Sequence, residues 1–76
     1  MDITDAVMHM VMASGKSQYQ VSTDAGRAKA YVSVLKSGRV DPSSRVLADI
    51  AHACGYRLIL ASEDGTDTIE LDGTRR

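Results

Sequence analysis

Apolar residues recur every three to four positions through the first 55 residues, the spacing that places them on one face of a helix. Glycines at 15, 26, 38 and 55 interrupt this pattern at regular points. Glycine commonly ends a helix because it adopts the left-handed conformation without steric cost. The pattern therefore predicts four helices, at about residues 4–14, 17–25, 28–37 and 42–54.

Polar residues at the helix starts support these boundaries. Asp2, Ser17 and Asp41 are the expected N-caps of the first, second and fourth helices, because their side chains can accept hydrogen bonds from free backbone amides. Ser17 and Gln20 form a capping-box pattern, and Pro42 suits the first helical position. The expected inward faces are Ile3, Ala6, Val7, Met10, Val11 and Ser14; Val21, Ser22 and Ala25; Ala28, Val32 and Leu35; and Val46, Leu47, Ile50, Ala51 and Cys54.

After Gly55 the apolar period changes from that of a helix to that of a strand. The runs YRLILAS and TDTIEL flank Asp64-Gly65, which predicts a β-hairpin with a two-residue turn. This turn places two apolar pairs on one face and a charge pair on the other. The pairs are Leu60 with Ile69, Leu58 with Leu71, and Arg57 with Asp72.

The outward face of the third predicted helix, within GRAKAYVSVLKSGR, is unusual because it is small and weakly polar. Ala30, Ser33 and Val34 lie on it, and Lys29 and Lys36 lie at its margin. Small residues permit close approach to base edges in the major groove, where methyl groups can touch thymine. Lysines at the margin can reach the phosphates, so this face favours DNA binding.

Charge is unevenly distributed along a chain whose net charge is −1. The segment 16–45 is net basic, whereas both flanking segments are acidic, and a local basic field attracts phosphate. A scatter of ordinary surface charge is the alternative. The cations of this segment are Lys16, Arg27, Lys29, Lys36, Arg39 and Arg45.

The run QYQVSTDAGRAKAYVSVLKSG resembles the Xre/Cro-type helix-turn-helix family of phage repressors and small bacterial regulators. The matching positions are Gln18, Val21, Ser22, Gly26, Val32, Ser33 and Gly38. The segment DPSSRVLADIAHACGYRL is similar to the family's fourth helix, so that the resemblance covers roughly residues 3–60. It implies a mostly α, lambda repressor-like bundle of four helices, with the C-terminal β-hairpin outside the match. The expected organisation is a DNA-binding domain at 1–55, the hairpin at 56–72 and a flexible tail at 73–76.

The resemblance also implies roles for single residues. Gln18 would contact a phosphate and brace the recognition helix, although it could serve only as part of the helix cap. The residues implied to face the bases are Lys29, Ala30, Ser33 and Val34. Lys36 and Arg39 would hold the DNA backbone. Alternatively, the cations are solvated surface and Val34 contacts a protein.

Three residues depart from the family pattern, among them Val34, which is apolar where family members often carry a polar residue that reads bases. Arg27 replaces the usual aliphatic residue after the turn glycine and is expected to point at phosphate. Ala28 replaces a capping serine or threonine. Base discrimination is therefore expected to depend on methyl contacts and DNA shape.

The family usually binds DNA as a dimer, and the hairpin is the expected dimerisation element. A two-stranded ribbon is unstable alone, so it requires a partner or its own helices to pack against. Both arrangements remain open. The residues expected at a dimer interface are Leu58, Ile59, Leu60, Ile69 and Leu71.

No catalytic or metal site is expected. His9, His52 and Cys54 lack the spacing of metal ligands, and no nucleophile–base pair or glycine-rich phosphate loop is visible, so neither an enzyme nor a cofactor is indicated. A lone cysteine, no long apolar run and an acidic start favour a cytoplasmic protein without membrane attachment. The family resemblance implies that it is bacterial or phage-encoded and associated with the nucleoid. The sequence thus predicts a transcriptional regulator, with repression the favoured mode, that binds double-stranded DNA as a dimer. The alternative is an antitoxin-type or other module that binds a toxin or another protein.

Overall fold

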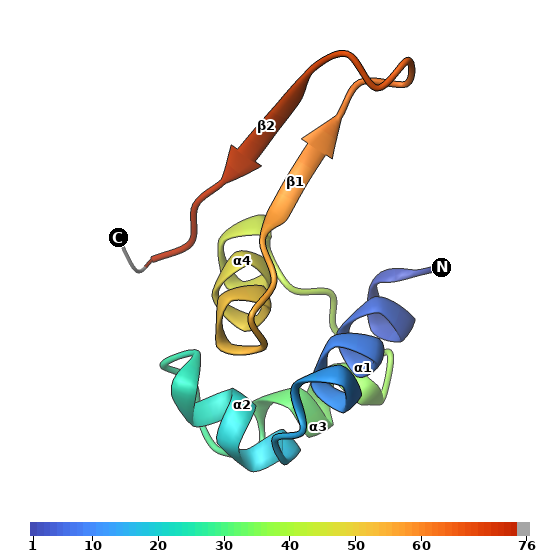
Figure 1. The fold of residues 1–76 in the computed structure, drawn as a ribbon. Coiled ribbons are helices and arrows are strands. Elements are labelled where there is room, and N and C mark those ends of the chain that lie inside the picture. The colour runs from blue at the N-terminus through green and yellow to red at the C-terminus, as the bar shows by residue number, and fades with distance from the viewer. Residues whose placement is uncertain (75–76) are drawn as a thin grey trace.

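The computed structural model describes residues 1–74, which form four helices followed by an antiparallel hairpin (Figure 1). The helices gather at one end of the molecule and the hairpin projects away from them (Figure 1). The elements are α1 (Ile3–Ser14), α2 (Gln18–Asp24), α3 (Tyr31–Lys36), α4 (Ser44–Ala53), β1 (Leu58–Ala61) and β2 (Thr68–Leu71). The predicted order of four helices and a C-terminal hairpin is confirmed. No helix within residues 1–74 is long and apolar enough to cross a membrane.

The starts of α1 and α2 are capped as predicted. Asp2 Oδ1 accepts from the Asp5 amide at 2.8 Å, and Ser17 Oγ accepts from the Gln20 amide at 3.0 Å. The reciprocal half of the capping box is not made, because the Gln20 side chain donates to Asp24 Oδ1 at 2.6 Å instead. Each bond satisfies one of the free amides in the first turn of its helix.

The prediction for the start of α4 is wrong by two residues. Ser43, not Asp41, is the N-cap, and its hydroxyl oxygen accepts from the Val46 amide at 3.3 Å. Ser43 has an extended backbone, which leaves Pro42 outside the helix. Two capping residues stand close together here, and the sequence pattern alone selected the wrong one.

The third helix begins at Tyr31 rather than at Ala28. Residues 28–30 form a turn in which the Tyr31 amide donates to the Ala28 carbonyl at 2.9 Å. Ala28 is exposed, so its expected inward position is wrong. The physical reason is that Ala28 has no side chain that could cap a helix, whereas the Ser22 hydroxyl oxygen accepts from the Val32 amide at 3.0 Å and fixes the start of the helix further along the chain.

The core is aliphatic and lies between the four helices. Its largest buried side chains include Leu35, Ile50 and Val7. Burial of one such side chain contributes about 1.5–3 kcal/mol. Burial also raises the pKa of the Cys54 thiol, against smaller opposing effects of Ser14 and Lys16. Ile3 was expected to face inward but is 41% exposed, because it lies in the first turn of α1. The core cluster is Val7, Val11, Val21, Ala25, Val32, Leu35, Ile50, Ala53 and Cys54.

The hairpin has the predicted register, with Leu58 opposite Leu71 and Leu60 opposite Ile69. The predicted two-residue turn is wrong. The Ser62 amide donates to the Asp67 carbonyl at 2.8 Å, and the Gly65 amide donates to the Ser62 carbonyl at 2.9 Å, so residues 63–66 form a longer loop. This loop preserves the register because it extends both sides of the expected turn equally.

The charge pair of the hairpin also differs from the prediction. Arg57 Nη1 lies 3.4 Å from Glu70 Oε1, not against Asp72. A long side chain can reach a diagonal neighbour on the same face of a hairpin, and that diagonal contact is the one formed here.

Gly73 and Thr74, expected within a flexible tail, are held on α4. The Thr74 amide donates to Asp49 Oδ1 at 2.8 Å and its hydroxyl donates to Asp49 Oδ2 at 2.6 Å. Residues 75–76 of the expected tail lie outside the described residues.

Candidate nucleic-acid interface

The turn between α2 and α3 is fixed by backbone hydrogen bonds around Gly26. The Gly26 amide donates to the Thr23 carbonyl at 3.0 Å, and the Arg27 amide donates to the Ser22 carbonyl at 2.9 Å. This pair of bonds is the Schellman arrangement, which needs a left-handed residue between them. Gly26 supplies it with a φ of 75°, so the chain reverses sharply before α3.

Ser22 ties the start of α3 to α2. Its hydroxyl donates to the Gln18 carbonyl at 2.8 Å, and its oxygen accepts from the Val32 amide at 3.0 Å. The serine is buried, and its bond to the Val32 amide is shielded from water. Ser22 thereby caps a helix that has no cap hydrogen bond from its own N-cap side chain.

The two sides of α3 differ sharply in burial. Val32 and Leu35 are 0% and 1% exposed and face the core, whereas Val34 is 45% exposed. The surface opposite Val32 and Leu35, with the adjoining loops, is called the α3 outer face below. It consists of Lys29, Ala30, Ser33, Val34, Lys36 and Arg39, all of which are exposed.

Gln18 reaches the α3 outer face from the start of α2. Its Oε1 accepts from the Ser33 hydroxyl at 3.0 Å, which joins the two helices at the surface. The expected bracing of α3 by Gln18 is therefore present, and Gln18 does more than occupy the first position of α2. Within residues 1–74, the side-chain nitrogen Nε2 of Gln18 makes no hydrogen bond to another residue.

The basic residues near α2 and α3 fall into two groups. Lys16 Nζ binds Asp24 Oδ2 at 2.9 Å and the Ala53 carbonyl at 2.8 Å, and Arg27 Nη2 lies 3.3 Å from Asp49 Oδ2. These two cations are engaged internally, and Arg27, expected to point at phosphate, lies against α4.

Three cations of the α3 outer face are not engaged in this way. In the part of the chain that the structure describes, the side chains of Lys29, Lys36 and Arg39 make no ion pair or hydrogen bond. The face therefore presents small side chains bordered by cations that are free to meet an anion.

Two residues of this region were missed by the sequence analysis in their present roles. Ser22 was assigned to the buried face of α2 and to the family pattern but not to a cap of α3, and Asp49 was not singled out at all. Asp49 is 1% exposed, within the apolar run LADIA. An acid among inward-facing apolar residues is the signal that could have identified it, since a buried carboxylate requires partners.

The described residues contain no group of three or more metal-ligating side chains that could hold an ion. Comparison with family models, curated proteins and solved structures found no match to this chain.

Proposed function

We propose that this protein is a sequence-specific regulator that binds double-stranded DNA, in which α2 and α3 act as a helix-turn-helix of the Xre/Cro type. The observation that carries the proposal is the α3 outer face. The major groove is about 12 Å wide and accepts one helix. A helix with small outward side chains can approach base edges closely, while cations at its margins meet the phosphates.

We assign the residues of this surface to two kinds of DNA contact, base edges and phosphates. Ala30, Ser33 and Val34 are the proposed base-facing residues, with Lys29 the one that could donate to guanine. Lys36 and Arg39 would bind phosphates at the end of α3. Gln18 would brace Ser33 through its oxygen and donate to a phosphate through its nitrogen.

Arg27 receives a different role in this proposal. Its guanidinium is paired with Asp49, so it would support the turn before α3 rather than bind DNA through its full charge. Its side chain is 31% exposed, so the exposed part could still contact a phosphate weakly.

The regulator would act as a dimer joined through the hairpins. One helix-turn-helix binds weakly, and dimers read two half-sites about 34–36 Å apart. Leu60 and Ile69 form a cross-strand pair and are each 55% exposed. The base of the hairpin packs on α4, whereas this distal pair is uncovered within residues 1–74. The hairpin of a second subunit would cover this pair. We place the regulator in the cytoplasm, on the nucleoid, because its proposed ligand is DNA.

Selection from a pool of random duplexes tests the proposal directly. The protein is incubated with the pool at low salt, and the retained duplexes are sequenced. The expected result is one enriched motif with two related halves. Retention without enrichment would contradict sequence specificity, and no retention at low salt would contradict DNA binding altogether.

A protein-interaction function of the antitoxin type is the second candidate. It is favoured by one observation, the exposed Leu60–Ile69 pair beside the acidic residues of the hairpin, a surface suited to a basic protein partner. It takes precedence if the duplex pool is not retained, since the α3 outer face would then lack its proposed ligand.

A further inference from the structure

Asp49 joins three distant parts of the chain. Its buried carboxylate on α4 accepts from the amide and the hydroxyl of Thr74, and it pairs with Arg27. Arg27 belongs to the turn before α3, and Thr74 follows β2. These residues, together with Gly73, are called the Asp49 junction below.

The contacts of the junction depend on one another. A buried carboxylate is unfavourable unless it is paired and hydrogen-bonded, so each partner helps to keep Asp49 in place for the others. Hydrogen bonds to a charged group are also stronger than neutral ones. A loss at Thr74 is therefore expected to weaken the hold of Asp49 on Arg27.

Gly73 permits this close approach. A Cβ atom at position 73 would overlap the Asp49 carboxylate and press on the Arg45 carbonyl oxygen. Only glycine lets the backbone after β2 pass so near α4. The end of the hairpin therefore contacts Asp49 through the backbone at Gly73 as well as through Thr74.

We infer that Asp49 is a positioning residue that fixes the C-terminal end of the hairpin relative to the turn that orients α3. The inference deepens the proposed function and rests on it for its consequence. In a dimer joined through the hairpins, the angle between hairpin and α3 sets the distance between the two recognition helices. The Asp49 junction therefore determines which half-site spacing the dimer accepts.

Thr74→Val in the free protein tests the link without DNA. The variant removes the hydroxyl donor and nearly preserves the shape of the side chain. The expected results are a shift of the Arg27 side-chain Nε–H resonance and severalfold faster hydrogen exchange over residues 27–32. The amides of α1 should keep their rates, because a local link does not weaken the whole fold.

Thr68→Val is the matched control, since Thr68 is an exposed β2 threonine whose side chain makes no hydrogen bond within residues 1–74. Asp49→Asn is the second variant; it keeps an acceptor for Thr74 but removes the charge, and it should shift the Arg27 resonance further. Changes confined to residues 49 and 72–74 would overturn the inference. So would exchange accelerated equally in α1, which reports only a loss of global stability.

Duplexes that carry the selected half-sites at several spacings test the consequence. The unaltered protein should bind duplexes of one spacing most tightly. Thr74→Val should still bind, but with similar affinities for the different spacings. An equally sharp preference in Thr74→Val would overturn the assignment of spacing to the junction. If the unaltered protein binds no duplex, the proposed function fails, and the exchange experiment alone decides whether Asp49 links the two segments.

Discussion

The hydroxyl oxygen of Ser22 lies 3.0 Å from the amide nitrogen of Val32, so a side chain of α2 caps the start of α3. Both groups are buried. Ser22→Ala is expected to lower the free energy of unfolding by about 1–3 kcal/mol, because the Val32 amide would be left without a partner. Urea denaturation followed by circular dichroism measures this change.

Ser44→Ala is the control for this prediction. Ser44 is an exposed serine at the start of α4, and its side chain makes no hydrogen bond among the described residues. Its replacement should change stability by no more than about 0.5 kcal/mol. Equal effects of the two substitutions would show that Ser22 does not anchor α3.

Features that depend on contacts between residues close in the sequence were largely predicted from the sequence. The caps at Asp2 and Ser17 bind amides three residues away, and the register of the hairpin follows from the alternation of its apolar residues. These local signals are carried by neighbouring residues. They were sufficient for the number and order of the elements.

Nonlocal contacts explain the missed cap of α3 and the missed role of Asp49, whereas the wrong cap of α4 and the wrong hairpin turn are choices between neighbouring residues. The cap of α3 comes from Ser22, ten residues before Val32, and Asp49 binds residues 22 and 25 positions away. No periodic pattern links such positions. The outward set on α3 was nevertheless identified, because Ser33 and Val34 follow the helical period, and Lys29 and Ala30 lie exposed in the preceding turn.

Replacement of Lys29 and Lys36 together by alanine is expected to weaken DNA binding and its dependence on salt. Each phosphate contact contributes about 0.9 to the slope of log K against log salt concentration. The double variant should therefore reduce the slope by about 1 per subunit, because Lys36 is the proposed phosphate contact of the two and Lys29 is placed against the bases. Fluorescence anisotropy with a labelled duplex at several salt concentrations measures the slope.

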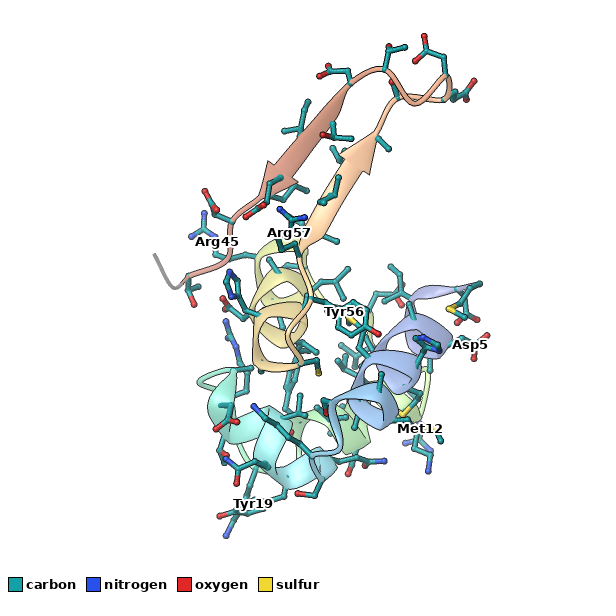
Figure 2. The ribbon with its side chains drawn as sticks, in the orientation of Figure 1. Asp5, Met12, Tyr19, Arg45, Tyr56 and Arg57 are labelled. Carbon is teal, nitrogen blue, oxygen red and sulfur yellow. The ribbon has the colours of Figure 1, made fainter. Side chains whose placement is uncertain are left out.

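Arg45→Ala with Arg57→Ala removes the same charge elsewhere. Both residues lie toward the hairpin end of α4, away from α2 and α3 (Figure 2). This variant should leave the slope nearly unchanged. An equal reduction in both variants would indicate a nonspecific effect of net charge and would contradict the assignment to α3.

Asp64 should make the hairpin loop sensitive to acid. Its Oδ1 accepts from the amide of Thr66 and from the hydroxyls of Ser62 and Thr66, and these bonds lower the pKa of Asp64 from 3.8 to about 2. Because the folded form has the lower pKa, the stabilisation is complete above pH 3.8 and is lost as pH falls through about 2. NMR titration of the carboxyl carbon measures this pKa directly.

Asp64→Asn is the companion variant for the acid titration. It removes the titrating group, so the Thr66 amide resonance should lose its change over about two pH units centred on the lowered value of about 2. A carboxyl group that titrates near 3.8 in the intact protein would show that the loop bonds do not persist in solution.

Replacement of Leu60 and Ile69 by serine tests the hairpin as the dimer interface. The two side chains form one exposed apolar pair beyond the part of the hairpin that packs on α4. Because each is already 55% exposed, their loss should change the stability of the monomer little, whereas a dimer would lose the centre of its interface. Sedimentation velocity at micromolar concentration should show a dimer for the unaltered protein and an 8.2 kDa species for the variant.

Met12→Ser is the control for the dimer experiment, because Met12 is an apolar residue of α1 that is 84% exposed and lies away from the hairpin (Figure 2). It should leave the dimer intact, since a scattered exposed apolar residue is ordinary on a protein surface. Loss of the dimer in both variants would place the interface beyond the hairpin. A single 8.2 kDa species for the unaltered protein would contradict dimerisation, and recognition of two half-sites would then require another means of joining two copies.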